Sequence, residues 1–426
     1  MTVGRLGVGG SLVLLVSTGP LSLGVAQAQP DTTDTCITCH RALGVERLAG
    51  PVELFTDDIH RTTGFSCVSC HGGDATVMTP AAMDSALGFV RDIQPSQISQ
   101  LCGRCHSDGQ FMRNYNPSLR VDQVAEYATS VHGQRLDQYN DSLVATCVSC
   151  HPAHEIRPPS DPNSSVHPLQ VAGTCGQCHG NVERMAVYAI PTNQRDEYEQ
   201  SIHWEKLSVE QDLSAPTCND CHGNHGAAPP GISWVGNTCG QCHAVMAEQY
   251  NGSPHARLFT LMGQPGCATC HGNHAIVEAD DELLGLGEGA VCTQCHVEGV
   301  GGGVTAARMR ALIDSLRTSV HVADSILAYA ENAGVEVSQA LFELEAAQTA
   351  LVLARASIHS FTLDSVEARV GEGLAITTEA YEHGLDAVSE IRFRRTGLAV
   401  SSVIILLLLT GLILKIKSLD RETPAA

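Results

Sequence analysis

Aromatic side chains are scarce in this sequence, because Phe, Trp and Tyr together make up only 4% of its 426 residues. Aromatic residues normally supply much of the buried area of large cores, so something else must fill the interior. Basic residues are also few, with 25 Lys and Arg against 46 Asp and Glu and a net charge of -21. This charge would repel a polyphosphate, which argues against nucleic acid as a partner and favours a basic patch on a partner protein.

No cysteine stands alone in the sequence. All 18 belong to nine Cys-x-x-Cys-His blocks. Two thiols at this spacing reach the two vinyl groups of one haem, and the histidine that follows supplies the proximal iron ligand. The thiols could instead form nine disulfides or zinc knuckles, but neither alternative requires a histidine after every pair. The sequence therefore predicts nine covalently attached c-type haems.

The blocks define two sets of predicted site residues. The cysteines predicted to carry haem are Cys36, Cys39, Cys67, Cys70, Cys102, Cys105, Cys147, Cys150, Cys175, Cys178, Cys218, Cys221, Cys239, Cys242, Cys267, Cys270, Cys292 and Cys295. The predicted proximal ligands of iron are His40, His71, His106, His151, His179, His222, His243, His271 and His296.

Eleven further histidines could close the irons from the opposite side. Most lie either in a Ser-x-His context, of which Asp58-Ile59-His60 is a variant, or three residues after a block. The predicted distal ligands are His60, His132, His154, His167, His203, His225, His255, His274 and His321. His359 and His383 are left over as spare candidates. Ligation by Met112, Met246 or Met262 stays open as an alternative, and it would raise the reduction potential of the haem concerned.

The blocks after the first form four repeated units. Each unit has a leading histidine, a first block, usually a histidine three residues later, and a second block. The units begin their blocks at Cys67 and Cys102, Cys147 and Cys175, Cys218 and Cys239, and Cys267 and Cys292. A histidine three residues past a block cannot easily reach the far face of its own haem, so we expect it to ligate a neighbouring one. Unit one has Asp74 at that position.

Both ends of the chain carry apolar segments. Residues 1–28 are typical of a secretory signal peptide, with Arg5 at its start and a small-x-small cleavage site at Ala26-Gln27-Ala28, although an uncleaved anchor is an alternative. Residues 396–416 are expected to form a transmembrane helix, followed by a cytoplasmic tail at 417–426 with Lys417 and Arg421. A buried core helix is the less natural interpretation this close to the C-terminus.

The expected fold is mainly α. Residues 29–300 would form a nonahaem domain of short helices and loops around a stack of nine haems. Residues 301–395, which lack cysteine, would form a bundle of long helices. Apolar residues at helical spacing predict a first helix up to about residue 332, with the stripe Met309, Ile313, Leu316, Val320, Ala323 and Leu327. A second is expected over 338–357 and a third from about 363, through Val366, Val370, Leu374 and Leu385. The bundle could serve solely as a link between the haems and the membrane. It could also contribute His321 or His359 to the haem domain, or mediate homo-oligomerisation.

The block, Ser-x-His and Cys-His-x-x-His patterns resemble those of multihaem cytochromes c of the doubled Cys-x-x-Cys-His type. The long helices after the last block are distantly similar to the group that contains hydroxylamine oxidoreductase and cytochrome c nitrite reductase. That resemblance implies either electron transfer or chemistry on a small nitrogen compound. Some members of the group have a Cys-x-x-Cys-Lys block at the catalytic haem, and this sequence has none.

These observations lead to two functional expectations. The first is a periplasmic, membrane-anchored electron carrier of a respiratory chain. Its partners would be a quinol-oxidising membrane cytochrome or iron-sulfur subunit, soluble periplasmic cytochromes, and the cytoplasmic membrane. The alternative is an oxidoreductase that acts on a small nitrogen or sulfur compound at one haem with an open site, for which the neighbourhood of Asp74 is the first place to look. No catalytic residue is assigned, and enzyme activity is left undecided.

Overall fold

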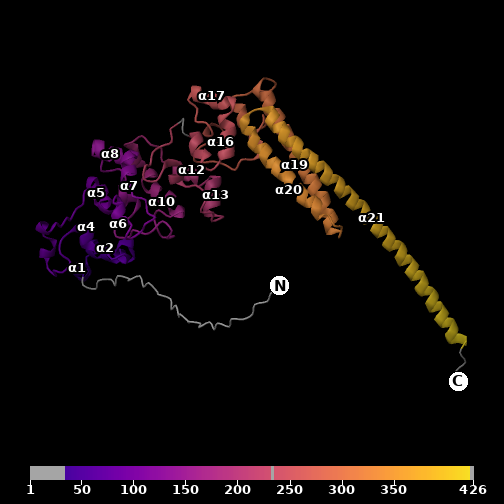
Figure 1. The fold of residues 1–426 in the computed structure, drawn as a ribbon, viewed down its shortest axis with the longest axis horizontal. Coiled ribbons are helices and arrows are strands. Elements are labelled where there is room, and N and C mark those ends of the chain that lie inside the picture. The colour runs from indigo at the N-terminus through magenta and orange to yellow at the C-terminus, as the bar shows by residue number, and fades with distance from the viewer. Residues whose placement is uncertain (1–33, 232–234, 423–426) are drawn as a thin grey trace, which may run out of the picture.

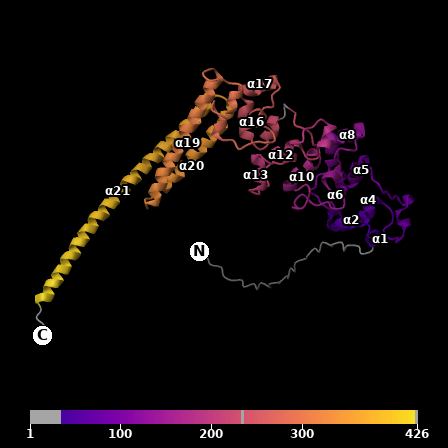
Figure 2. The same ribbon diagram turned by 180° about the vertical axis from the view of Figure 1, so that it is seen from behind.

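The computed structural model describes residues 34–231 and 235–422, and these residues form helices and loops with no strand. The prediction of a mainly helical fold is confirmed. Figure 1 shows an elongated molecule in which many short helices are followed by three long ones, and the last of these extends well beyond the others. The view from behind in Figure 2 shows the same succession along the molecule. The predicted signal peptide, residues 1–28, lies outside the described residues.

The part that contains the blocks is built from helices of 4 to 12 residues and short 3-10 turns. Its helices are α1 (Thr35–Leu43), α2 (Glu46–Leu54), α3 (Ile59–Thr62), α4 (Cys67–His71), α5 (Pro95–His106), α6 (Gly109–Met112), α7 (Gln123–Thr129), α8 (Val131–Tyr139), α9 (Cys147–Cys150), α10 (Pro168–His179), α11 (Val182–Ala186), α12 (Gln194–Tyr198), α13 (Ile202–Ser208), α14 (Cys218–His222), α15 (Val235–Gly240), α16 (Ala244–Asn251), α17 (Pro254–Met262) and α18 (Ala268–His271). The 3-10 turns are η1 (Phe55–Asp57), η2 (Pro80–Met83), η3 (Ser85–Leu87), η5 (Asp281–Leu283) and η6 (Val291–Gln294).

Three long helices follow the last block: α19 (Gly302–Asn332), α20 (Ser338–Ser357) and α21 (Leu363–Glu422), with η7 (Ile358–Ser360) between the last two. The predicted bounds of α20 and the predicted start of α21 are confirmed. The core of this bundle is rich in alanine, which allows the helices to approach closely. It is formed largely by Ile313, Leu316, Ala323, Leu327, Leu344, Ala347, Ala354, Val366, Val370 and Ala380.

The prediction that Leu385 belongs to the bundle core is wrong. Leu385 is 47% exposed. The buried stripe of α21 instead continues through Ala380, Ala387 and Ile391, which keeps the spacing of three and four residues that one helix face requires. Between them, Gly384 brings α21 close to α19, because a Cβ built there would lie 2.4 Å from Cγ2 of Ile326.

The C-terminal part of α21 leaves the bundle. Within the described residues, it lies in the one helix long and apolar enough to cross a membrane, and its most apolar stretch has no buried residue. The side chains from Val403 to Leu409 are all at least half exposed. Such a run of exposed apolar residues is costly in water, which supports a role for this helix as a membrane anchor.

Candidate haem-binding sites

The histidines of the chain meet in pairs. All 20 lie in the described residues, and 16 of them form eight contacts between two imidazole rings. In every one of these contacts, one ring comes from a block and the other does not. The pairs are His71–His154, His106–His60, His151–His225, His179–His132, His222–His274, His243–His203, His271–His359 and His296–His255. Eight of the nine blocks therefore have one non-block histidine opposite them.

The spacing of the rings fits a metal between them. The ring centres are 5.9 to 6.4 Å apart. Two imidazole–metal bonds of about 2 Å, with about 1.1 Å from each nitrogen to its ring centre, give about 6.2 Å. The angle between the ring planes varies from 12° to 89°, which two ligands on one axis tolerate because each ring can rotate about that axis. Aromatic rings also pair at such distances without a metal, but that explanation does not account for a block histidine in every pair.

The ring nitrogens are oriented as metal ligands require. Where a paired histidine has a hydrogen-bond partner, Nδ1 makes the bond and Nε2 is left free. Nδ1 of His60 donates to Asp58 at 2.9 Å, and Nδ1 of His359 to the carbonyl of Ala356 at 3.0 Å. Similar bonds hold His71 to Val90 and His222 to Ala228. A ligating histidine typically donates its second N–H in this way, which fixes its tautomer and orientation.

Burial keeps most of these rings neutral, the form that has a lone pair for a metal. It lowers the pKa of at least one ring in each of the eight pairs, and of both rings in the pair His132–His179, and the facing ring contributes to every shift except that of His179. The residues whose pKa is lowered include His106, His132, His151, His154, His179, His203, His222, His255 and His271.

The leading histidines owe their position to helix capping. In units two, three and four, the serine of Ser-x-His is the N-cap of a helix, and its Oγ accepts a hydrogen bond from a backbone N–H of the first turn. Asp58 performs the same role before His60. The histidine therefore always stands at the second position of the helix. In each unit it faces the second block of that same unit.

Each histidine that follows a block faces the preceding unit. His154, His225 and His274 lie opposite His71, His151 and His222, respectively. This agrees with the expectation that such a histidine serves a neighbouring block.

A repeated backbone hydrogen bond holds these units together. The N–H groups of Ile59, Val131 and Ile202 donate to the carbonyls of Ile156, Ala227 and Ile276, at 2.8, 3.0 and 2.8 Å. Each donor follows the cap residue of one unit, and each acceptor lies two residues after the post-block histidine of the next unit. In unit four the equivalent residue is Pro254, which has no N–H, and no unit follows it.

The bundle completes unit four. His359, in η7, lies opposite His271, and Phe361 packs against His255 with ring centres 3.9 Å apart. Thus the two blocks of the last unit both depend on the short segment between α20 and α21.

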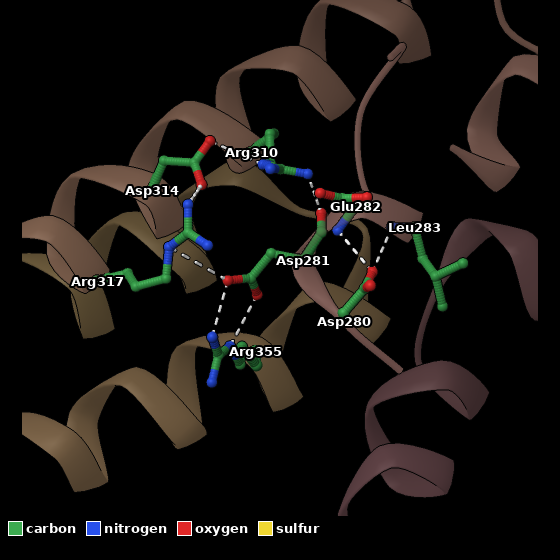
Figure 3. A network of polar contacts seen from close by, with 8 residues as sticks. All are labelled: Asp280, Asp281, Glu282, Leu283, Arg310, Asp314, Arg317 and Arg355. Atoms are coloured by element: carbon green, nitrogen blue, oxygen red, sulfur yellow. Dashed lines mark hydrogen bonds and ion pairs between the residues drawn. The ribbon is translucent and has the colours of Figure 1, made fainter. Parts of the chain in front are cut away.

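An arginine clamp holds this segment in place. Asp281, in the loop between the last two blocks, is only 8% exposed and accepts two hydrogen bonds from Arg355, at 2.8 and 2.7 Å. Figure 3 shows this pair together with Arg317, which lies 3.7 Å from the same carboxylate, and Arg310, which donates to the Asp281 carbonyl. Arg355 stands one helical turn before His359. The clamp therefore docks the loop on the bundle beside the pair that needs it.

Consecutive blocks are neighbours in space. The thiols of Cys102 and Cys147, of Cys175 and Cys218, and of Cys239 and Cys267 lie close enough for each to shift the pKa of the other. For the other pairs of consecutive blocks, burial raises the pKa of a thiol in one block. A thiol of the adjacent block, which must lie nearby, raises that pKa further. These neighbours are Cys36 for Cys67, Cys102 for Cys70, Cys178 for Cys150, Cys242 for Cys221 and Cys292 for Cys270. The nine blocks thus form one series in chain order.

Two predicted distal ligands are not placed opposite a block histidine. His167 is buried and acts as the N-cap of α10, where its Nδ1 accepts a hydrogen bond from the N–H of Leu169 at 3.3 Å. An Nδ1 acceptor implies a proton on Nε2, so this tautomer offers no lone pair there. His321 is exposed in the middle of α19. His383, which was spare in the sequence analysis, is exposed on α21.

Sequence reasoning underrated His359. It has the Ser-x-His context, as does His321, but His359 lies where a helix ends. Ser357 does not act as a cap, since its Oγ donates to the carbonyl of Leu353; the end of the helix at Ser357 is the signal that separates the two histidines. The methionine alternative gains no support from Met262, whose side chain is 56% exposed.

His40 is the one block histidine without a facing ring. The described residues include every histidine of the chain, and none makes a ring contact with His40. Asp74 does not take part either, since its carboxylate accepts hydrogen bonds from the N–H and hydroxyl of Thr76.

The donor set fits haem better than a metal held by protein alone. Among the described residues, no group of three or more His, Cys, Asp or Glu side chains could hold a metal ion, whereas structural zinc requires four ligands. A haem supplies its own four nitrogens and needs only an axial pair. All 18 thiols are described, and all are free of disulfide bonds.

The chain matches no protein-family model, no curated protein and no solved structure.

Proposed function

We propose that the chain is a membrane-anchored nonahaem cytochrome c that passes electrons along its haems in chain order. The eight ring pairs carry this proposal, because each joins the histidine of one block to one other histidine at the separation that an axial metal pair requires. The block cysteines would hold the haems, and the paired histidines would be their axial ligands. Bound haem supplies one-electron chemistry, whose potential depends on ligands, burial and nearby charge.

The proximity of consecutive blocks supports conduction rather than nine independent sites. Groups that exchange electrons must lie close together, and each block has the next one as a neighbour. The low aromatic content agrees with an interior that porphyrin rings would fill. The acidic chain, with a net charge of -21, would recognise a basic patch on a soluble periplasmic cytochrome.

The apolar part of α21 would place the protein at the periplasmic face of the cytoplasmic membrane. Its donor there would be a quinol-oxidising cytochrome or iron-sulfur subunit. The bundle would act as a spacer and would supply His359. A homo-oligomer could form through exposed apolar side chains of the bundle such as Phe342, which is 67% exposed.

The haem count tests the class of protein. Full-length protein purified in detergent should carry nine covalently bound haems by mass and by haem absorbance per polypeptide. A polypeptide that contains zinc or disulfides in their place would contradict the proposal.

Removal of one middle block tests conduction in chain order. The variant Cys147→Ser/Cys150→Ser should hold eight haems and be reduced in two kinetic phases, because the series is interrupted. The matched variant Cys36→Ser/Cys39→Ser removes a block at the end of the series. Its other eight haems should be reduced in a single fast phase. Equal kinetics in the two variants would exclude a single path.

A further inference from the structure

The first block differs from the other eight in lacking a histidine opposite its own. We infer that the haem site of Cys36, Cys39 and His40 is open on its distal side and takes a small neutral ligand. This inference rests on the proposed function, since it concerns one of the nine haem sites.

The repeat itself accounts for the missing ring. The second block of each unit is faced by the leading histidine of that unit, as His60 faces His106. The first block stands where the second block of an earlier unit would stand, because Cys67 begins unit one. Its leading histidine would have to precede Cys36, and none of residues 1–35 is a histidine.

The same repeat explains Asp74. A post-block histidine serves the first block of the preceding unit, as His154 serves the block of His71. The histidine that Asp74 replaces would serve a first block ahead of Cys36, and residues 1–35 contain no cysteine. Asp74 is therefore free for another role, and it stabilises a turn through Thr76. In the same turn, the carbonyls of Ala75 and Val77 accept hydrogen bonds from Thr35, which directly precedes the first block.

The remaining histidines cannot serve the first block as placed. His167 caps α10 through Nδ1. His321 and His383 lie on long helices of the bundle, at the opposite end of the series of blocks (Figure 1). The methionines that follow the turn, Met78 and Met83, are 52% and 38% exposed, whereas an axial thioether would be covered by the ring it ligates.

The charge beside the first block favours a neutral ligand. Asp34 is 8% exposed, and its Oδ1 accepts a hydrogen bond from the N–H of Cys36 at 2.9 Å. Its carboxylate, after burial, raises the pKa of the Cys36 thiol, so it lies close to the block. None of the ion pairs that the described residues form involves Asp34. A buried carboxylate without a cation disfavours a second anion nearby, so water, carbon monoxide or nitric oxide should bind in preference to nitrite.

Spectroscopy of the full-length protein in detergent tests the inference without a variant. Electron paramagnetic resonance of the oxidised protein should show one high-spin iron in nine. The reduced protein should bind one carbon monoxide per nine haems, and nitrite should leave the oxidised spectrum unchanged. Nine low-spin irons with no carbon monoxide binding would overturn the open site, while nitrite binding would overturn the ligand class. A protein without haem would instead contradict the proposed function.

Two matched variants assign the open site to the first block. Cys36→Ser/Cys39→Ser should retain eight haems and lose all carbon monoxide binding. Cys292→Ser/Cys295→Ser, which removes a block with a paired histidine, should also retain eight haems but still bind one carbon monoxide. Retention of binding in the first variant would overturn the assignment. If either variant fails to assemble, the carbon monoxide count of the unmodified protein still decides whether a site is open.

Discussion

His359 and His321 offer a direct test of the ring pairs. Both lie in Ser-x-His sequences of the bundle, yet the structure places His359 opposite His271 at 6.1 Å and leaves His321 exposed. Replacement of His359 by alanine removes one imidazole from one of nine sites. If the pair is axial, one further iron in nine should become high-spin, and the reduced protein should bind one more carbon monoxide.

The size of this effect follows from the isolation of the pair. Each other non-block ring already faces a block histidine or lies elsewhere, so none is free to replace His359. The covalent cysteines should hold the haem count at nine, which separates loss of a ligand from loss of a haem. His321→Ala is the control, because the side chain of His321 makes no hydrogen bond or ring contact that explains a change. The reasoning is refuted if His359→Ala has the unmodified spectrum, or if His321→Ala changes spin state instead.

Three further predictions concern the clamp, a ligand-orienting carboxylate and the anchor. Asp281→Asn should lower the free energy of unfolding by about 1–2 kcal/mol in urea titrations followed by circular dichroism, whereas Glu372→Gln, at an exposed ion pair, should change it by less than about 0.5 kcal/mol. Asp58→Asn should loosen one axial ligand and change a low-spin paramagnetic resonance signal, whereas Asp74→Asn should not. A chain ended after Arg395 should leave the membrane fraction and keep nine haems, because the buried bundle core lies before that point.

Each of these has a contrary outcome. Equal stability of the Asp281 and Glu372 variants would show that the clamp adds nothing. If Asp58→Asn alters stability but leaves the paramagnetic resonance spectrum unchanged, the carboxylate has a structural role only. A truncated chain that stays in the membrane fraction would exclude α21 as the sole anchor.

The clamp also predicts a dependence of stability on pH. Burial of Asp281 opposes ionisation, but the hydrogen bonds from Arg355 prevail and lower its pKa below the usual 3.8. A carboxyl group with a lowered pKa in the folded state contributes stability above its ordinary pKa and loses it as the pH falls through the lowered value. The gap in stability between the unmodified protein and Asp281→Asn should therefore close below about pH 4. A gap that persists in acid would mean that the charge is not responsible.

Much of the site arrangement was accessible from the sequence because the repeat is local. The serine caps of α8, α13 and α17 lie two residues from the histidines they position, so spacing alone marked these residues. Sequence also gave the long helices, since their apolar stripes are regular. Leu385 was misplaced because the buried stripe of α21 continues through alanines, which a search for large apolar residues overlooks.

The rest depended on tertiary structure. Which block each histidine faces is set by backbone hydrogen bonds between units, such as that from Val131 to Ala227 over 96 residues. Likewise, the bond between Asp281 and Arg355 spans 74 residues, and neither residue belongs to a motif. Such long-range contacts leave no periodic trace in a single sequence.

The interlocked repeat leaves two different problems at its two ends. Every internal unit borrows a histidine from the next one, so the last unit needs a ring from elsewhere, and η7 of the bundle supplies it through His359. At the other end, the first block needs a leading histidine that no earlier unit provides, and nothing in the described residues replaces it. The end near the bundle is therefore closed by the segment that precedes α21, while the distant end keeps the one unpaired block histidine. If electrons enter from the membrane, this asymmetry places the exchangeable site at the far end of the series, where a small molecule or a soluble partner can reach it.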